Sequence, residues 1–320
     1  MFCTVYVLLL LALPAALLAR PLAERVDPQV ATWVLTGTAA VLSVASSAAL
    51  ALLTFTGLLR LPAVAAMGRW SVGVLRQGTP AWDGLPLLAG ALLAALTART
   101  LRTLRRRTRA LRTAAVETAR LPEAVALGGG DIVVLDDPAA EAFAVPGPAG
   151  RIVVSTGMLA ALAPEERTVL IAHERAHLRD RHYLFVTAAH LAAAANPLLR
   201  PLARHVSYTV ERWADERAAH ATGDRRRVAC AIGKAALAGR RFGAGRSPHG
   251  SAALHATGTP ATPSAVPRRV AALLEPPPSR PPLVIALTVT LTVLSTAGIC
   301  CADLAHDVVR LLELARAAER

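Results

Sequence analysis

The amino-acid sequence predicts an α+β domain inserted between about four transmembrane helices. Hydrophobic residues make up 54% of the 320 residues, which is more apolar surface than a water-soluble domain can bury. Long uncharged stretches lie near both ends of the chain. The segment between them contains short β-branched runs followed by helical patterns, which is typical of a small sheet followed by helices.

Four apolar stretches are expected to cross the membrane. The first, residues 1–19, lacks the basic start and the small-residue cleavage site of a signal peptide, so an uncleaved span is predicted. The second, Pro28–Leu59, is uncharged and longer than the ~20 residues that a spanning helix needs. Gly84–Ala98 is shorter, but flanking arginines can extend to the interface. Leu283–Ala302 makes the fourth span.

Arginine dominates the charge of the chain and sets its expected orientation. The net charge is +13, and Lys234 is the only lysine. Seven arginines follow the third span: Arg99, Arg102, Arg105, Arg106, Arg107, Arg109 and Arg112. By the positive-inside rule this end of the span faces the cytoplasm, which places the N-terminus and residues 303–320 outside the cell. The run has no interleaved aromatic residues, so an anchor on anionic lipid of the plasma membrane is favoured over nucleic-acid binding.

The expected spans divide the chain into three parts. Residues 1–115 hold three spans and the basic segment, residues 116–279 form a cytoplasmic domain, and residues 280–320 hold the fourth span and a short tail. Turn-forming glycines and prolines separate three strand-like runs at the start of the domain. These runs are Asp131–Asp137, Ala142–Val145 and Arg151–Ser155.

Three helices are expected after the strands. The first begins near Pro164, a favoured first helical residue, and ends with Arg179 and Arg181. The other two are Val206–Thr222 and Arg225–Ala238. Residues 239–267 are rich in Gly, Pro, Ser and Thr and are expected to form a flexible loop.

Between the first two of these helices lies the apolar stretch Tyr183–Leu199. Only eleven residues separate Leu199 from Glu211, which is too few for a return crossing of about 20 residues. We therefore expect this helix to stay on one side of the membrane, packed in the domain or against the membrane surface. The histidines in and around it, His182, His190 and His205, are expected to be structural.

The first domain helix carries His173-Glu174-Arg175-Ala176-His177. Histidines four residues apart project from one helical face, so both imidazoles can bind one Zn²⁺. Glu174 lies beside that face and can accept a proton from a metal-held water and return it to the leaving amine. Five residues make a weak pattern by themselves, and a solvated helix with two histidines is the alternative interpretation.

A third metal ligand is available downstream. A catalytic zinc site needs three protein ligands and one open position, and Glu211 lies 34 residues after His177 in a helical pattern. Asp215, one turn later, can accept the N–H of a ligating histidine. The alternative for Glu211 is an ordinary surface acid. The combined pattern predicts one zinc ion per chain, held by His173, His177 and Glu211.

Taken together, these motifs resemble those of the gluzincin membrane proteases. The similarity is to the BlaR/MecR-type signalling peptidases and their relatives of the HtpX and CAAX prenyl protease type, and it runs from about Asp131 to Leu274. It rests on HERAH, ERWADERAA and PRRVAALL with the preceding strands. The resemblance implies a zinc endopeptidase in which one strand borders the cleft and pairs with extended substrate. That strand is made of Ala142, Phe143, Ala144 and Val145.

Two departures from the family pattern affect the expected function. Relatives of the prenyl protease type carry a possible oxyanion-stabilising histidine before a proline, where this chain has Thr262 and Pro263. His249 or His255 could substitute if the loop folds back, and His255 is our candidate. BlaR-type sensors also carry an extracellular penicillin-binding domain, which is not expected after Arg320, so direct antibiotic sensing is not predicted.

The predicted function is that of an integral membrane zinc metalloendopeptidase, acting through a Glu-activated water in regulatory proteolysis. Its expected partners are a protein or peptide substrate and the lipid bilayer, and nucleic acid is not expected. The alternatives are a quality-control protease for membrane proteins and a catalytically silent signalling scaffold that retains the zinc fold. The sequence does not address the oligomeric state.

The expected orientation can be tested with alkaline phosphatase fusions, because this enzyme is active only outside the cytoplasm. Fusion after Ser279 should give no activity, and fusion after Arg320 should give activity, because the arginine run holds the intervening domain inside. The opposite pattern of activity would contradict the orientation.

Overall fold

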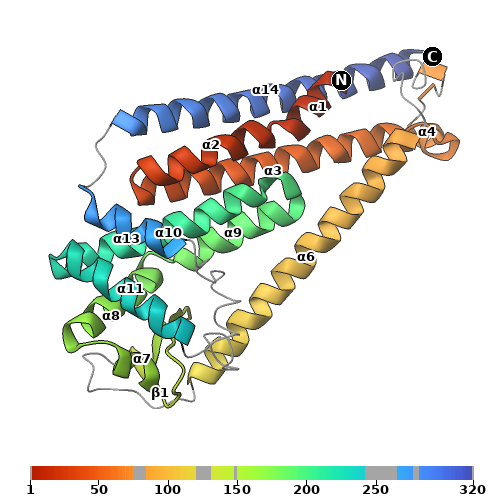
Figure 1. Cartoon of the computed structure of the whole chain (residues 1–320). Coiled ribbons are helices and arrows are strands. Elements are labelled where there is room, and N and C mark those ends of the chain that lie inside the picture. Colours follow the sequence, from red (N-terminus) through yellow and green to blue (C-terminus); the bar gives the residue numbers. More distant parts are fainter. Residues whose placement is uncertain are drawn as a thin grey trace.

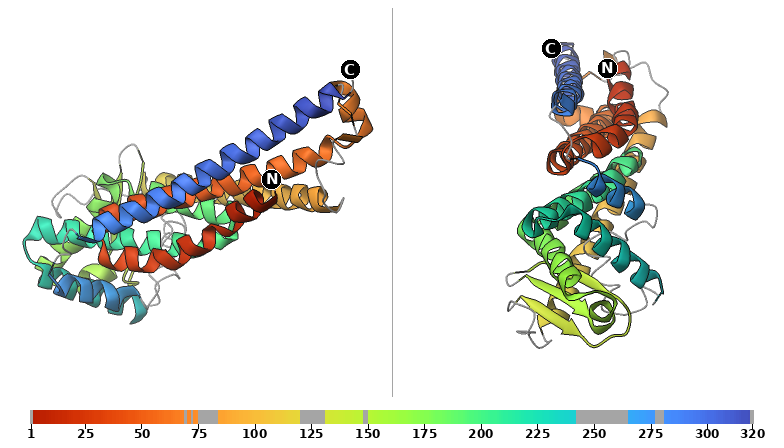
Figure 2. Two further views of the ribbon diagram at one scale, coloured as in Figure 1. Left: turned by 90° about the horizontal axis from the view of Figure 1, so that it is seen from above. Right: turned by 60° about the vertical axis from the view of Figure 1, so that its left-hand side comes forward.

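The computed structural model describes residues 2–68, 70–71, 73–74, 84–119, 131–147, 150–241, 265–276 and 281–318. The described chain is mostly helical and has one small sheet. Long helices gather at one end of the molecule, and the sheet lies at the other end, away from both termini (Figures 1 and 2). The predicted architecture, a small α+β domain between membrane-spanning helices, is confirmed.

Within the described residues, four helical segments are long and apolar enough to cross a membrane. They are Val5–Arg25, Pro28–Leu58, Gly84–Thr118 and Thr290–Ala317. The first consists of α1 (Phe2–Leu10) and α2 (Ala12–Arg25), and the others belong to α3 (Pro28–Leu58), α6 (Gly84–Ala119) and α14 (Pro281–Ala317). The prediction of four spans is therefore confirmed, and the chain is a multi-pass membrane protein.

The central helix of the bundle is α3, which packs against α14, α6, α9 and α10. Its start is fixed by Asp27, whose carboxylate accepts hydrogen bonds from the backbone N–H groups of Gln29 and Val30. At the far end α3 and α6 approach closely, because Gly57 has no Cβ and leaves room for Pro86. A short helix, α4 (Pro62–Gly68), follows α3 at this end.

The third spanning helix is longer than its apolar part. Helix α6 continues without interruption through the arginine run to Ala119, where it contacts β2 of the domain (Figure 1). One rigid element thus carries the chain from the far end of the bundle to the sheet.

The sheet contains β1 (Ile132–Leu135), β2 (Ala142–Val145) and β3 (Arg151–Ser155), in the order β1-β3-β2. Strand β1 pairs parallel with β3, and β2 pairs antiparallel with β3, with Phe143 opposite Val153. Ser155 ends β3 and caps α7 (Thr156–Ala161) by accepting a hydrogen bond from Met158 N–H. Strand β2 is therefore at an edge of this sheet. It also contacts helix α6 and the helix that begins at Pro164.

Four helices complete the domain: α8 (Pro164–Arg179), α10 (Arg200–Thr222), α11 (Arg225–Arg241) and α13 (Ala265–Leu274). Helix α8 begins as expected with proline, and the Glu166 carboxylate accepts a hydrogen bond from Ala163 N–H. Glu166 also pairs with Lys234 of α11, which joins the two helices. Helix α10 begins six residues earlier than predicted, because its first turns belong to a hairpin with α9.

That hairpin determines where the apolar helix lies. Helix α9 (His182–Ala195) packs against α3, α6 and α10, beside the spanning helices, and a 3-10 turn at Pro197–Leu199 joins it to α10. Asn196 at the tip donates a hydrogen bond to Ser46 Oγ (3.2 Å), while Thr32 and Thr209 Oγ1 atoms are 2.9 Å apart near the base.

The hairpin therefore runs along α3 from Thr32 to Ser46, about 21 Å at the helical rise of 1.5 Å per residue, and then returns. It does not need to cross the membrane, which keeps α8 and the later part of α10 on the same side. We expected a helix packed in the domain or against the membrane surface; α9 does pack against α10, but it also packs against α3 and α6, because a helix that is apolar all round needs apolar neighbours on every side. The spanning helices provide them.

Candidate metal centre

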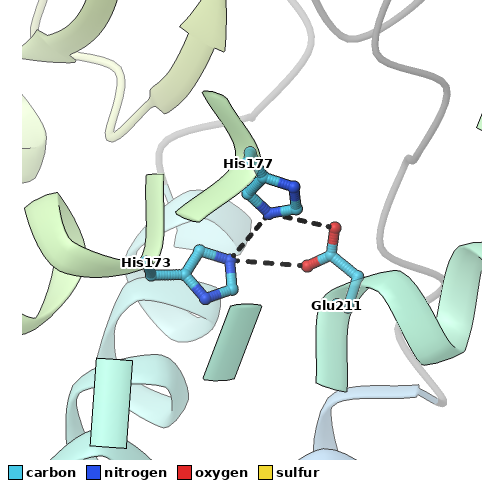
Figure 3. Close-up of side chains that lie close together, drawn as sticks. All are labelled: His173, His177 and Glu211. Carbon is cyan, nitrogen blue, oxygen red and sulfur yellow. Dashed lines mark hydrogen bonds and ion pairs between the residues drawn. The ribbon is translucent and has the colours of Figure 1, made fainter. Parts of the chain in front are cut away.

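Three side chains converge between α8 and α10. His173 and His177 project from α8 toward Glu211 of α10 (Figure 3). The two Nε2 atoms are 3.2 Å apart, and the two Glu211 carboxylate oxygens face them separately, with Oε2 3.7 Å from His173 Nε2 and Oε1 3.7 Å from His177 Nε2. His173 is buried, whereas the side chains of His177 and Glu211 are 18% and 15% exposed. The group is therefore largely buried, and His177 and Glu211 are its more accessible members.

These separations suit a metal ion. A tetrahedral zinc ion with bonds of about 2.0–2.2 Å holds its donor atoms roughly 3.3–3.5 Å apart. The Nε2–Nε2 separation of 3.2 Å and the N–O separations of 3.7 Å, each to a different oxygen of Glu211, lie on either side of that range. Two imidazoles and one carboxylate are also a donor set found in catalytic zinc sites. His173, His177 and Glu211 can therefore hold a metal ion between them.

A buried ion-pair network supports two of these side chains. Asp215 Oδ1 lies 3.0 Å from Nδ1 of His173, the ring nitrogen that faces away from the convergence point. Arg269 of α13 binds both Asp215 oxygens, at 2.7 and 2.6 Å, and its Nη1 lies 2.9 Å from Glu211 Oε2. One guanidinium thus holds two carboxylates at fixed positions.

Sequence reasoning did not assign a role to Arg269, although PRRVAALL was part of the resemblance. The four-residue spacing of buried positions along α13 could have identified it. Ala265, Arg269 and Leu273 are four residues apart and all buried, whereas Arg268 is exposed. An arginine on the apolar stripe of a helix needs a buried carboxylate partner. That spacing distinguishes Arg269 from its neighbour.

The network concentrates negative charge around the two histidines. Burial raises the pKa of the Glu211 and Asp215 carboxyls, but the Arg269 guanidinium and the neighbouring histidines together outweigh it and hold both pKa values below their usual range. Burial lowers the pKa of His173, yet Asp215 and Glu211 raise it to about 10. Burial lowers the pKa of His177 to about 4. The site therefore favours a positive charge beside His173 and a neutral ring at His177.

Glu174 lies beside this group on α8 and is itself buried. Burial raises the pKa of its carboxyl to about 7, and a hydrogen bond with the backbone of Ala144 opposes part of that shift. Because Ala144 belongs to β2, this bond connects the sheet edge with the helix that carries both histidines. A carboxyl that titrates near neutral pH can both accept and release a proton.

The centre lies level with the domain ends of the first two spans. Arg212, next to Glu211, donates hydrogen bonds to the backbone carbonyls of Ala23 (2.6 Å) and Glu24 (3.3 Å) at the end of α2. Arg268, next to Arg269, lies 3.2 Å from the Glu24 carboxylate. Both helices that bear the charged network are therefore tied to the end of the first span.

The remaining histidines named from the sequence differ in their positions. His182 is buried and its Nδ1 lies 3.0 Å from Nδ1 of His177, so it touches a member of the metal-binding group. His190 and His205 lie on α9 and α10, away from the three convergent side chains. His249, His255 and Thr262 lie outside the described residues.

A helix with two metal-binding histidines, a second helix with a glutamate and a small sheet, all joined to spanning helices, define a membrane metallopeptidase. Comparison with known families agrees: residues 102–277, more than half of the chain, match the family described as Peptidase family M48. The chain belongs to this peptidase family. No curated protein and no solved structure matches it.

The role of Arg269 can be tested by stability. Arg269→Ala would leave two buried carboxylates without their counter-charge, and breaking a buried pair costs about 3–5 kcal/mol. Arg269→Lys should recover part of this loss, because an ammonium cannot bind both carboxylates with the same geometry. Denaturant unfolding of the purified protein in detergent measures the effect.

The matched control is the neighbouring exposed residue. Arg268→Ala should cost no more than about 1 kcal/mol, since pairs between exposed side chains contribute little. Equal losses for the Arg268 and Arg269 variants would contradict the central position of Arg269.

Proposed function

We propose that this protein is a zinc-dependent endopeptidase that cuts protein substrates close to the membrane. The observation that carries the proposal is the convergence of His173, His177 and Glu211 with the buried Glu174 beside them. A structural zinc site normally has four protein ligands, whereas this group offers three. It also contains an ionisable carboxyl that metal binding alone would not require. Both features favour a peptidase over a silent scaffold.

In this proposal His173, His177 and Glu211 hold one zinc ion per chain. When bound, zinc supplies a Lewis acid that polarises the substrate carbonyl and promotes loss of a proton from water. Asp215 orients the His173 ring by accepting its Nδ1–H, and Arg269 in turn fixes Asp215 and Glu211. The chain thus presents two ring nitrogens and one carboxylate oxygen in a preset arrangement.

Glu174 is the proposed proton carrier. Its burial and its raised pKa, about 7, suit a group that takes a proton from the attacking water and later gives it to the leaving amine. The hydrogen bond with Ala144 holds the carboxyl near the sheet edge, where the scissile bond would lie. We also propose that His255 stabilises the oxyanion that forms on the substrate carbonyl.

The substrate would bind along β2. This strand pairs with β3 on one side, and among the described strands none pairs with its other edge. An extended peptide can add to such an edge through backbone hydrogen bonds. Ala142, Phe143, Ala144 and Val145 are the proposed contacts, because Ala144 already reaches Glu174.

The position of the centre favours substrates near the bilayer. Arg212 and Thr209 bind the domain ends of α2 and α3, so the ligands lie at the level where these spans leave the membrane. We propose a plasma-membrane location with residues 116–279 in the cytoplasm, on the basis of the arginine run. We prefer a role in regulatory cleavage. Quality control of membrane proteins is the alternative, and it would use the same arrangement of site residues.

The experiment that tests the proposal is Glu174→Gln. The amide has nearly the same volume but cannot accept a proton, so cleavage should fall about 10²–10⁴-fold while zinc remains bound. Proteomics of cells with intact protein or the variant should reveal fragments that vanish. Zinc content is measured on the same purified proteins.

The matched control is Glu165→Gln, which changes an exposed glutamate in the first turn of the same helix. It should leave both cleavage and zinc content unchanged. A Glu174→Gln protein that retains zinc and generates the same fragments at the same rate would remove Glu174 from the mechanism and favour the scaffold.

A further inference from the structure

The two histidines of the centre have different partners on their outer nitrogens. His173 Nδ1 faces the Asp215 carboxylate at 3.0 Å, and that carboxylate is held by Arg269. His177 Nδ1 faces another imidazole, with His182 Nδ1 at 3.0 Å. A ligating histidine usually donates its second N–H to an oxygen acceptor. The presence of the His182 imidazole, where an oxygen acceptor is usual, needs a separate explanation.

The geometry determines which ring donates. Nε2 of His177 points to the convergence point, where it lies 3.2 Å from His173 Nε2 and 3.7 Å from Glu211. If Nε2 binds a cation, the ring hydrogen must be on Nδ1. His182 Nδ1 can then only accept, and its own hydrogen is on Nε2. The two rings therefore adopt complementary tautomers.

The surroundings of His182 leave it few other roles. The residue is 1% exposed, and its ring packs on Trp213 with centroids 4.6 Å apart. Within the described part of the chain, Nε2 of His182 has no hydrogen-bond partner. Buried polar atoms are usually paired, so a histidine selected only for packing would be a costly choice here. Among the described residues, the polar contact of its ring is with His177.

The backbone between the two histidines is shaped for this contact. Arg181, immediately before His182, has φ of 51°, the only positive φ among the described residues other than glycine. This left-handed turn ends α8 and starts α9, so that the His182 ring folds back onto a side chain five residues earlier. Arg217 of α10 donates to Asp180 (2.9 Å) and holds the turn. Such backbone strain is typically retained where function requires it.

We propose that His182 is a positioning residue for the metal centre, which accepts the Nδ1–H of His177 and so fixes its tautomer and ring orientation. It does for His177 what Asp215 does for His173, but without adding a negative charge. This inference rests on the proposed function, in which His177 is a metal ligand. It assigns a function to a histidine that the sequence suggested was structural.

Two substitutions separate positioning from packing. His182→Asn keeps an acceptor oxygen near the place of Nδ1, whereas His182→Leu fills a similar space without an acceptor. Positioning predicts that the Asn variant binds zinc nearly as tightly as the unaltered protein and that the Leu variant binds about 10–100-fold more weakly. Packing predicts the opposite order, because a buried leucine is favourable and a buried asparagine is not.

The measurement is zinc affinity of the full-length protein in detergent, after removal of metal, by competition with a chelator. Melting temperatures of the metal-free proteins accompany it. His205→Leu is the control, since the charged groups that act on His205 are Arg268, Glu24, Arg204 and Arg20, none of which is a proposed metal ligand. It should leave zinc affinity unchanged.

The inference is supported if zinc affinity follows the order unaltered protein, Asn, Leu. Unchanged affinity in the Leu variant would overturn it, as would equal losses in both variants. Loss of zinc in the Leu variant with a metal-free melting temperature well below that of the Asn variant would overturn it too, because packing would explain the loss. His177→Ala separates the two proposals: if it binds zinc normally, the ligand set itself is wrong.

Discussion

The guanidinium of Arg269 lies where three helices meet, and it neutralises charge that the interior could not otherwise hold. Glu211 and Asp215 are both on α10, face the same histidines and are largely withdrawn from water. Without a cation between them, their mutual repulsion and desolvation would oppose folding of this part of the domain. Arg269 fixes α13 to α10 and sets the direction in which Glu211 points. The arrangement of His173, His177 and Glu211 therefore depends on a residue outside that group.

The second constraint comes from the membrane. The α9–α10 hairpin extends along α3 and returns, and polar contacts at Ser46 and Thr32 hold its tip and base. Glu211 follows directly on the returning arm, next to Arg212, which binds the end of α2. The hairpin thus fixes the position of Glu211 relative to the ends of α2 and α3. In the proposed function, the peptidase would act at the membrane boundary because the helix that carries Glu211 begins within the bundle.

Much of this arrangement follows from local sequence signals. The span positions, the strands Ala142–Val145 and Arg151–Ser155 and the start of the His173 helix depend on composition, turn residues and helix caps, which act over a few residues. The convergence of Glu211 on the histidines was expected from zinc chemistry. The place of α9 was not, because apolarity alone does not tell a helix buried in a domain from one beside the spans.

The contacts of Arg269 and His182 also escaped sequence reasoning, for a different reason. Both depend on tertiary approach: Arg269 follows residues 242–264, which lie outside the described part of the chain, and His182 meets His177 only through the left-handed turn at Arg181. Periodicity indicates that each of these side chains is buried, but not which polar group it contacts. Charged or ring side chains on apolar stripes are the positions where such contacts should be sought.

The central claim is that two imidazoles and one carboxylate hold a zinc ion, and X-ray absorption at the zinc K-edge of the purified protein tests it most directly. The account predicts one zinc per chain surrounded only by nitrogen and oxygen at about 2.0–2.2 Å, with the outer-shell signal of two imidazoles. In Glu211→Ala the imidazole signal should persist while zinc occupancy falls. A sulfur contribution near ~2.3 Å, or unchanged occupancy in Glu211→Ala, would contradict the account.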